Sequence, residues 1–317
     1  MPSFNQWKTD NYKFVGKAFE YAYANQLSKL SPVVGDVNAK SKDYELTGAG
    51  GYGELARYED EVNEGSLKRG FKTIITPEEY SLSIPVRYKE AQIDKFGETR
   101  KVGSRLGSSA AMTVYLHALR LFANAWNNDG KHNGGDGVPW ASESHPVASR
   151  GSSGRTFIPD PDAGTYSNVV KQALSVSAIT GAQTKANGFL TPDGLPFLCE
   201  MDTLLVSPAL AEKAAKLLGP EARLMPTHDP ESDYNAANPI YGMRYIVVGG
   251  GNDGFTGNQW ALCDRRLMKE LVNIVYITRP RVFQDKLDDP LKDLYTSYVD
   301  FGVGWGDARQ IIFGNPD

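Results

Sequence analysis

The sequence predicts a mixed α+β chain in which one domain is interrupted by a second. Three observations lead to this fold class. Residues 104–126 have the pattern of a long buried helix, residues 166–272 alternate strands with short helices, and residues 273–317 return to long strands. Because strand-rich sequence lies on both sides of the α/β stretch, we interpret residues 166–272 as an insertion.

The composition excludes several classes of protein. The chain has 317 residues, a formal net charge of −4 and no long basic run, which argues against condensation of nucleic acid by counterion release. Its two cysteines, Cys199 and Cys263, are too few for a disulfide framework or a cysteine metal site. The first residues lack the apolar core of a signal peptide, and no stretch is apolar enough to span a membrane. We expect a cytosolic, soluble chain without a cofactor.

Residues 1–45 predict a polar N-terminal arm that contains one amphipathic helix. Its apolar positions share a face between Tyr12 and Leu30, and Ser31-Pro32 ends it. Lysines and acidic residues are nearly balanced in this arm, so it is not a basic tail that binds nucleic acid. The residues of the predicted apolar face are Val15, Ala18, Phe19, Ala22, Leu27 and Leu30.

Residues 46–76 predict an extended loop, because glycines punctuate a charged stretch that holds few core residues. The first limb is acidic and the second is basic. Two interpretations stay open: a flap that contacts another subunit, or a surface hairpin whose charges provide solubility. The candidate interface residues are Glu54, Arg57, Glu59, Asp60, Glu61, Glu64, Lys68 and Arg69.

Residues 77–165 combine a strand, a helix and a long loop. Apolar residues alternate from Tyr80 to Tyr88, and Pro85 puts this strand at a sheet edge. The helix at 104–126, with Ser108 or Ser109 as N-cap, is apolar over most of its circumference, so it should be covered on several sides. The loop to about residue 165 is long enough that we expect it to lie on a neighbour. The helix's polar stripe is Thr113, His117, Arg120 and Asn124.

Residues 166–272 predict an α/β unit, and residues 273–317 predict closing strands. Helical spacing occurs at 169–178, and a buried strand at 202–206 precedes a helix that opens with Ser207-Pro208 and ends at Gly219. Further strands are predicted at 244–248 and 259–264, with a short helix at 265–271. The long strands are predicted at 272–283 and 295–306.

Motifs for cofactor or metal binding are weak. Gly249-x-Gly251-x-x-Gly254 has the letters of a dinucleotide fingerprint, but another strand follows where a helix is needed, so a tight turn is favoured. The loop NNDGKHNGGDG at 127–137 lacks the spacing and closing Glu of a calcium loop. An acidic turn could hold a cation at a subunit contact, although a solvated turn is favoured; its residues are Asp285, Asp288, Asp289 and Asp293.

The sequence supports no catalytic site. The four histidines, at 117, 132, 145 and 228, are dispersed. Ser144-His145-Pro146 and Thr227-His228-Asp229 contain suitable residue types, but triads are assembled across a fold and not from adjacent residues. A G-x-S-x-G nucleophile elbow is absent from the sequence. We therefore predict that the chain is not an enzyme.

The order of these elements resembles the major capsid proteins of tailed bacteriophages, which have the Hong Kong 97-type fold. Asp202–Leu218 resembles the family's strand and Pro-opened helix, and Ala237–Val248 resembles its Asn-Pro-x-x-Gly segment. The tail, with Gly306-Asp307-x-Arg309, is most similar to the head subunits of Mu-type phages.

The resemblance implies a division of the chain and a set of partners. It implies an N-terminal arm (1–45) that braces a neighbour and an extended loop (46–76) that lies over another. A peripheral domain (77–165 and 273–317) would hold the spine helix, and an axial domain (166–272) would meet fivefold and sixfold axes. Pentamers and hexamers would form an icosahedral shell around double-stranded DNA in a virion assembled in the bacterial cytoplasm. Expected partners are scaffolding, portal and decoration proteins. Some relatives join a loop Lys to an Asn, and Lys68 and Asn273 are of these types.

Two alternatives stay open. An encapsulin-like compartment shell shares the fold and would hold protein cargo. A ligand-binding or enzymatic α/β domain at 166–272 would use the glycine turn at 249–254 as its site. A shell around DNA should avoid a strongly basic inner wall, and the net charge of −4 without basic tracts agrees with the capsid interpretation.

Overall fold

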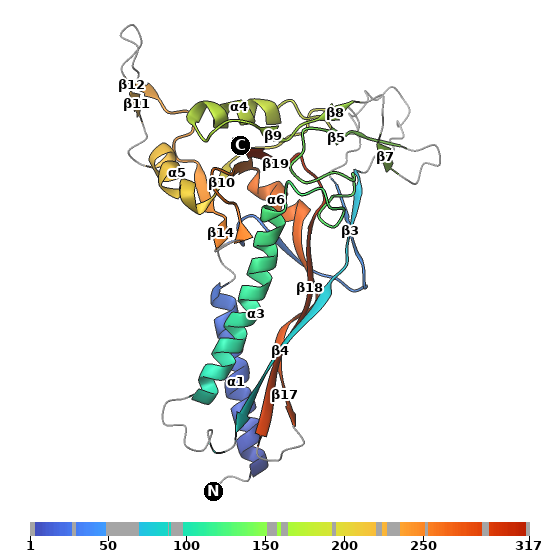
Figure 1. The fold of residues 1–317 in the computed structure, drawn as a ribbon, viewed down its shortest axis with the longest axis vertical. Helices are drawn as coiled ribbons and strands as arrows, with labels where there is room; N and C mark the ends of the chain where they lie inside the picture. The colour runs from blue at the N-terminus through green and yellow to red at the C-terminus, as the bar shows by residue number, and fades with distance from the viewer. Residues whose placement is uncertain are drawn as a thin grey trace, which may run out of the picture.

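The computed structural model describes most of the chain as one elongated molecule. Figure 1 shows two long helices and long strands in its lower part, and a smaller sheet with shorter helices above them. The described residues are 4–26, 30–48, 70–87, 89, 98–150, 157–159, 164–191, 195–219, 224–226, 235–250, 253–286 and 292–314.

The lower part is built on a four-stranded sheet in the order β1-β17-β18-β4. The pair β17–β18 is antiparallel and long, β4 is antiparallel to β18, and β1 joins β17 in parallel. Alternating apolar and polar residues give this sheet one face that packs on the helices. The strands are β1 (Gly35–Asn38), β4 (Glu78–Arg87), β17 (Val272–Lys286) and β18 (Lys292–Trp305).

Two helices, α1 (Phe4–Gln26) and α3 (Glu98–Ala123), pack on this sheet. The predicted helix at 104–126 is present, but it begins at Glu98 and ends at Ala123. It runs through Gly103 and Gly107, which a sequence pattern treats as weak helix positions. Both glycines lie against the backbone of α1, so the missing side chains let the two helices approach closely.

The described part of the N-terminal arm packs on its own chain, and the expected contact with a neighbour stays a prediction. Helix α1 packs on α3, and β1 extends the sheet through β17. The Tyr12 hydroxyl donates to the Val282 carbonyl at 3.0 Å. Arg279 donates to both carboxylate oxygens of Asp36 at 3.0 Å. The apolar face of the arm therefore covers the sheet of the same chain.

The strand predicted at 80–88 is confirmed as β4, and it lies at the edge of the sheet. Pro85 therefore removes no hydrogen bond from a central ladder. The predicted alternation is only partly matched by burial: Val86 is buried, whereas Leu82 is 46% exposed. The helices cover the sheet unevenly at this edge.

The upper part is a five-stranded sheet in the order β13-β10-β16-β19-β9, flanked by short helices. The helix predicted at 169–178 is wrong: residues 169–170 form a strand, and the helix begins at Val176, where the Ser175 hydroxyl accepts from the Ala178 N–H. The elements are β9 (Val169–Val170), α4 (Val176–Ala186), β10 (Thr203–Val206), η1 (Pro208–Leu210), α5 (Ala211–Leu218), β13 (Arg244–Val247), β16 (Trp260–Cys263), α6 (Arg265–Leu271) and β19 (Ile311–Gly314).

The C-terminal strand corrects the predicted division of the chain. Residues 273–317 were expected to close the peripheral domain, but β19 lies between β16 and β9 in the upper sheet. Its four residues are buried. The sheet of the inserted segment is therefore completed by the end of the chain.

The remaining strands form two-stranded pairs. In the glycine motif, Gly249 pairs with Gly254 in a short antiparallel pair, and a strand follows where a dinucleotide site would need a helix; the turn residues 251–252 lie outside the described residues. The pairs are β2 (Tyr44–Thr47) with β3 (Lys72–Ile75), β5 (His145–Pro146) with β8 (Thr165–Tyr166), β6 (Ala148–Arg150) with β7 (Phe157–Pro159), β11 (Leu224–Pro226) with β12 (Asn235–Ala237), and β14 (Gly249–Gly250) with β15 (Asp253–Gly254).

Candidate functional site

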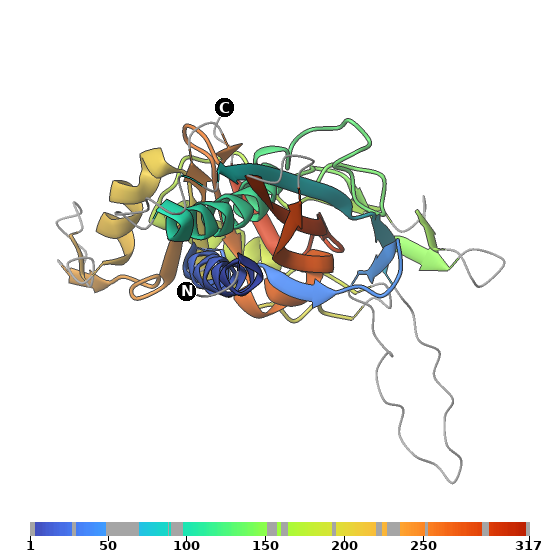
Figure 2. The same ribbon diagram turned by 90° about the horizontal axis from the view of Figure 1, so that it is seen from below.

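The candidate site is the root of the predicted extended loop. Strands β2 and β3 form an antiparallel stem on either side of residues 49–69, and the Gly48 N–H donates to the Phe71 carbonyl at 2.8 Å. Figure 2 shows where this stem leaves the body of the molecule. The predicted interface residues Glu54, Arg57, Glu59, Asp60, Glu61, Glu64, Lys68 and Arg69 lie outside the described residues.

The stem packs on alternate glycines at the end of β18. Gly302 and Gly304 of β18, and Gly306 directly after it, lie on one face, because every second residue of a strand does. A β-carbon on Gly302 would lie 2.8 Å from Ile75 Cγ2, and one on Gly306 would lie 2.7 Å from Leu46 Cγ. Ile75 and Leu46 thereby reach Val275 and form a small buried cluster. The seat leaves no room for larger side chains on β18.

The loop after α3 braces the same stem. The Gly135 N–H donates to Thr73 Oγ1 at 2.9 Å, and the Trp305 indole N–H donates to the His132 carbonyl at 3.3 Å. Trp140 and Ala141 are buried against the body. Parts of the loop therefore pack on their own chain, and a contact of its exposed residues with a neighbour stays a prediction.

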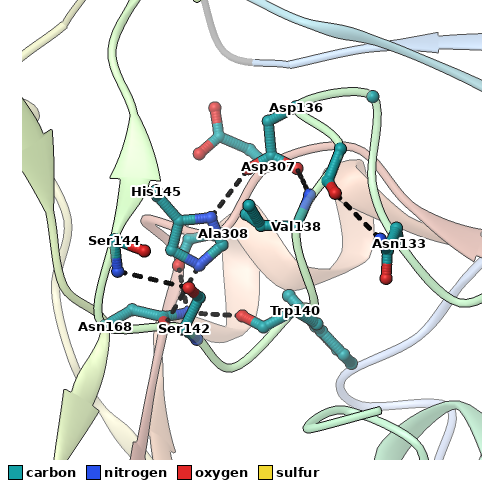
Figure 3. Close-up of polar contacts among 12 residues, drawn as sticks. Asn133, Asp136, Val138, Trp140, Ser142, Ser144, His145, Asn168, Asp307 and Ala308 are labelled. Atoms are coloured by element: carbon teal, nitrogen blue, oxygen red, sulfur yellow. Dashed lines mark hydrogen bonds and ion pairs between the residues drawn. The ribbon is translucent and has the colours of Figure 1, made fainter. Parts of the chain in front are cut away.

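A buried polar network anchors this loop, as Figure 3 shows. His145 is fully buried; its Nδ1 lies 2.7 Å from Asp136 Oδ2, and its Nε2 lies 3.2 Å from Asn168 Oδ1. The Asn168 amide donates to the carbonyls of Trp140 and Ala308. The network therefore joins the loop, the start of the upper sheet and the C-terminal segment.

A buried ion pair lies next to this network. Arg309 donates to Asp307 at 3.0 Å through Nε and at 2.5 Å through Nη2, and to the Leu190 carbonyl at 2.8 Å. Burial alone would lower the pKa of Arg309, but the charge and hydrogen bonds of Asp307 raise it. Its guanidinium also lies 4.7 Å from the Phe197 ring centroid. The tail motif Gly306-Asp307-x-Arg309 thus has a structural role, because its ion pair also holds the C-terminal segment to the backbone at Leu190.

A cleft of about 460 Å³ lies beside the stem, and most residues of the polar stripe of α3 line it. His117, Arg120 and Asn124 line it, together with β3, β4 and residues 131–133. Arg120 donates to Asp253 at 3.1 Å, and burial lowers the pKa of His117. The stripe is therefore explained by a polar hollow in the surface.

The structure does not bring the three described histidines together into one site. His145 contacts Asp136 and Asn168, and Ser144 uses its N–H to contact the Ser142 hydroxyl. His132 pairs with Asp129 on the surface. His228 lies outside the described residues. Among the residues that the structure describes, no group of three or more His, Cys, Asp or Glu could hold a metal ion.

Other predicted residues are dispersed. Asn273 is 2% exposed and donates to the Glu270 carbonyl, so its amide is engaged within its own subunit. Cys199 and Cys263 are free thiols. In the acidic turn, Asp293 is buried, while Asp288 and Asp289 lie outside the described residues. Within the described part of the chain, no helix is long and apolar enough to cross a membrane.

Sequence reasoning missed the seat of the stem and the network around His145. The glycines at 302, 304 and 306 recur with the period of a strand, which is a readable signal of close approach on one face. Asp136, His145 and Asn168 are 9 and 23 residues apart. No local pattern connects them, because only the folded chain brings them together.

Comparison with known proteins identifies a family. Residues 70–312 match the family model described as phage capsid protein. No curated protein sequence matches the chain.

Solved structures with the same fold include shells of several kinds. The chain matches a virus-like particle from Pyrococcus furiosus at 9% identity and a TM-score of 0.53, covering 96% of this chain and 99% of that one. It matches the capsid of Ralstonia phage GP4 at 13% identity and 0.52, with 90% and 87% covered. It matches the capsid of a native GTA particle at 11% identity and 0.50, with 91% and 89% covered. These likenesses confirm the predicted Hong Kong 97-type fold.

Proposed function

Because the chain belongs to the phage capsid protein family, we propose that it is the major head subunit of a tailed phage or prophage. In this proposal, pentamers and hexamers of the chain close into an icosahedral shell around double-stranded DNA. Scaffolding, portal and decoration proteins are its further partners. The similarity of its tail to Mu-type head subunits stays a prediction.

The observation that carries this proposal is the family match combined with the packed stem of β2 and β3 on either side of residues 49–69. A stem seated on glycines and braced by a second loop is suited to hold a charged segment in a defined direction. The acidic residues of this segment precede its basic residues, so two copies can offer each other opposite charges. We infer that the segment contacts a neighbouring subunit, where the ordering of a long charged loop is offset by new contacts.

Charge reversal tests this role. Changing Arg57, Lys68 and Arg69 to Glu should abolish closed shells while the subunit keeps its fold, since the charged, glycine-rich stretch that contains them holds few core residues. The matched control is Arg57→Lys, Lys68→Arg and Arg69→Lys, which keeps every charge and should still assemble. Electron microscopy measures shells, and circular dichroism measures the fold. Normal shells from the reversed variant would show that these charges do not join subunits.

A second candidate is a compartment shell that holds protein cargo. The observation that favours this second candidate is the match to a virus-like particle over 96% of this chain. The two functions predict different contents of native particles. Nuclease-protected DNA inside purified particles supports the phage head, whereas particles that hold protein and no DNA support the compartment.

A further inference from the structure

The protonation of His145 can be deduced from its neighbours. The orientation of the Asn168 side chain is set by three backbone groups. Its amide nitrogen lies 2.7 Å from the Trp140 carbonyl oxygen and 3.3 Å from that of Ala308, and its oxygen accepts from the Ser142 N–H at 3.0 Å. Exchanging the amide nitrogen and oxygen of Asn168 would place its NH2 group against the Ser142 N–H, so that two donors face each other. It would also place its oxygen against two carbonyl oxygens. Asn168 Oδ1 is therefore the atom that faces His145.

Both ring nitrogens of His145 consequently face acceptors. Nε2 lies 3.2 Å from Asn168 Oδ1, and Nδ1 lies 2.7 Å from the Asp136 carboxylate. A neutral imidazole donates from one nitrogen only, so it would leave a lone pair against an oxygen. We propose that His145 is a buried imidazolium, and that its charged hydrogen bond to Asp136 is a latch that holds the loop 134–137 on strand β3 of the stem.

The surroundings of His145 fit a paired charge. The His145 side chain is 0% exposed and that of Asp136 is 6% exposed, and a buried charge is stable only beside a well-placed partner. Tyr166 stacks on the imidazole at 5.1 Å between ring centroids, and Trp305 meets it edge-on at 6.5 Å. The nearby charges Asp307 and Arg309 pair with each other. Asp136 thus supplies the compensating negative charge.

The proton is linked to the stem through a short path. Asp136 follows Gly135, whose N–H donates to Thr73 of β3 at 2.9 Å. Asp136 also accepts from the Val138 N–H at 3.3 Å, which closes the turn. Loss of one of its two protons would replace the ion pair between His145 and Asp136 by a weaker neutral hydrogen bond, or would leave a lone pair of the imidazole against an oxygen. Either change would weaken the hold of this turn on the stem. The consequence for assembly rests on the proposed function, whereas the protonation itself does not.

Nitrogen-15 spectra of the full chain labelled at histidine test the inference directly. The chain has four histidines, so the His145 signals can be assigned by their loss in His145→Gln. At neutral pH we expect both His145 nitrogens to be protonated. His132 is the internal comparison, because its Nδ1 also lies 2.7 Å from a carboxylate, Asp129, but at the surface. A neutral His145, with one unprotonated nitrogen, overturns the proposal.

Hydrogen exchange tests the latch. Asp136→Asn should leave His145 neutral and speed exchange at the Gly135 amide by about tenfold or more, as expected when a charge-assisted hydrogen bond is lost. Asp129→Asn is the matched control and should leave that amide unchanged. Equal protection of Gly135 in both variants contradicts the latch. If Asp136→Asn does not fold, the wild-type spectrum still decides, and both readouts are independent of shell formation.

Discussion

At the scale of single residues, Asp300 is a buried carboxyl with one oxygen that accepts no hydrogen bond from the described residues. It is 7% exposed, and its Oδ1 has no hydrogen bond. It lies directly across from Glu79 on the next strand. Burial, and then the charge of Glu79, raises the pKa of Asp300. It shares a strand face with Gly302 and Gly304, so this buried carboxyl lies beside the glycines on which the stem packs.

We expect Asp300→Asn to stabilise the subunit at neutral pH by roughly 0.5–1 kcal/mol, since like charges opposite each other on a sheet are destabilising. The folded-state pKa of Asp300 lies above that of the unfolded chain. Its proton therefore favours the folded state below about pH 4, and this contribution is lost as pH rises through the folded value. Urea unfolding between pH 3.5 and 8 should show the gain of the variant shrinking in acid.

The control for this prediction is Asp253→Asn, which removes a partner of Arg120. It should destabilise the subunit slightly at neutral pH, by no more than about 1 kcal/mol. A gain for Asp300→Asn that is the same at every pH would mean that Asp300 does not titrate as inferred.

At the scale of elements, the pair α1–α3 depends on two glycines one helical turn apart. Val15 of α1 lies against Gly103, and Phe19 lies against Gly107. The contact four residues later in α1 is also four residues later in α3, so the two helices are parallel and side by side. Apolar residues of both helices then share one core with β4, β17 and β18. The close approach explains why helix-weakening residues occur inside α3.

Gly107→Ala should therefore destabilise the protein, by roughly 1–3 kcal/mol, because a β-carbon would overlap the Phe19 carbonyl. Gly16→Ala is the matched control: Gly16 is also inside a long helix, but nothing lies within 4 Å of an added β-carbon. It should stabilise the protein by about 1 kcal/mol, the usual helical advantage of Ala over Gly. Thermal unfolding gives both signs. Two shifts in the same direction would contradict the close-packed helix pair.

At the scale of the whole molecule, β19 joins the two parts of the chain. Ile312 belongs to the core of the upper sheet and its helices, whereas Phe313 belongs to the core that reaches α3, β17 and β18. Neighbouring residues on one strand thus serve two cores, because successive side chains point to opposite faces. We infer that the two parts unfold together.

Phe313→Ala should cost about 3–5 kcal/mol and lower a single unfolding transition. Phe283→Ala is the control, because Phe283 is 42% exposed and its loss should cost far less. Near-ultraviolet and far-ultraviolet circular dichroism should report the same midpoint for each variant. Two separate transitions would show that the parts of the chain are independent.

The sequence by itself determined the features that depend on local pattern. The period of four and three in the polar stripe predicted the spine helix, and alternation with Pro85 predicted an edge strand. The order of elements, and motifs such as Asp202–Leu218, led to the family and the fold that the comparisons confirm. These features can be read from the sequence because periodicity and helix caps involve only residues that are close together in the chain.

Only the tertiary structure decided the contacts between distant segments. The start of α3 depends on Val15 and Phe19, 88 residues earlier in the chain, and local propensity disfavoured glycine there. The strand β19 could join either sheet by pattern, and its partners were set by β16 and β9. His145, Asp136 and Asn168 have no shared spacing, and they meet because the loop folds onto its own chain. Long-range packing, which no short window of sequence contains, made these choices.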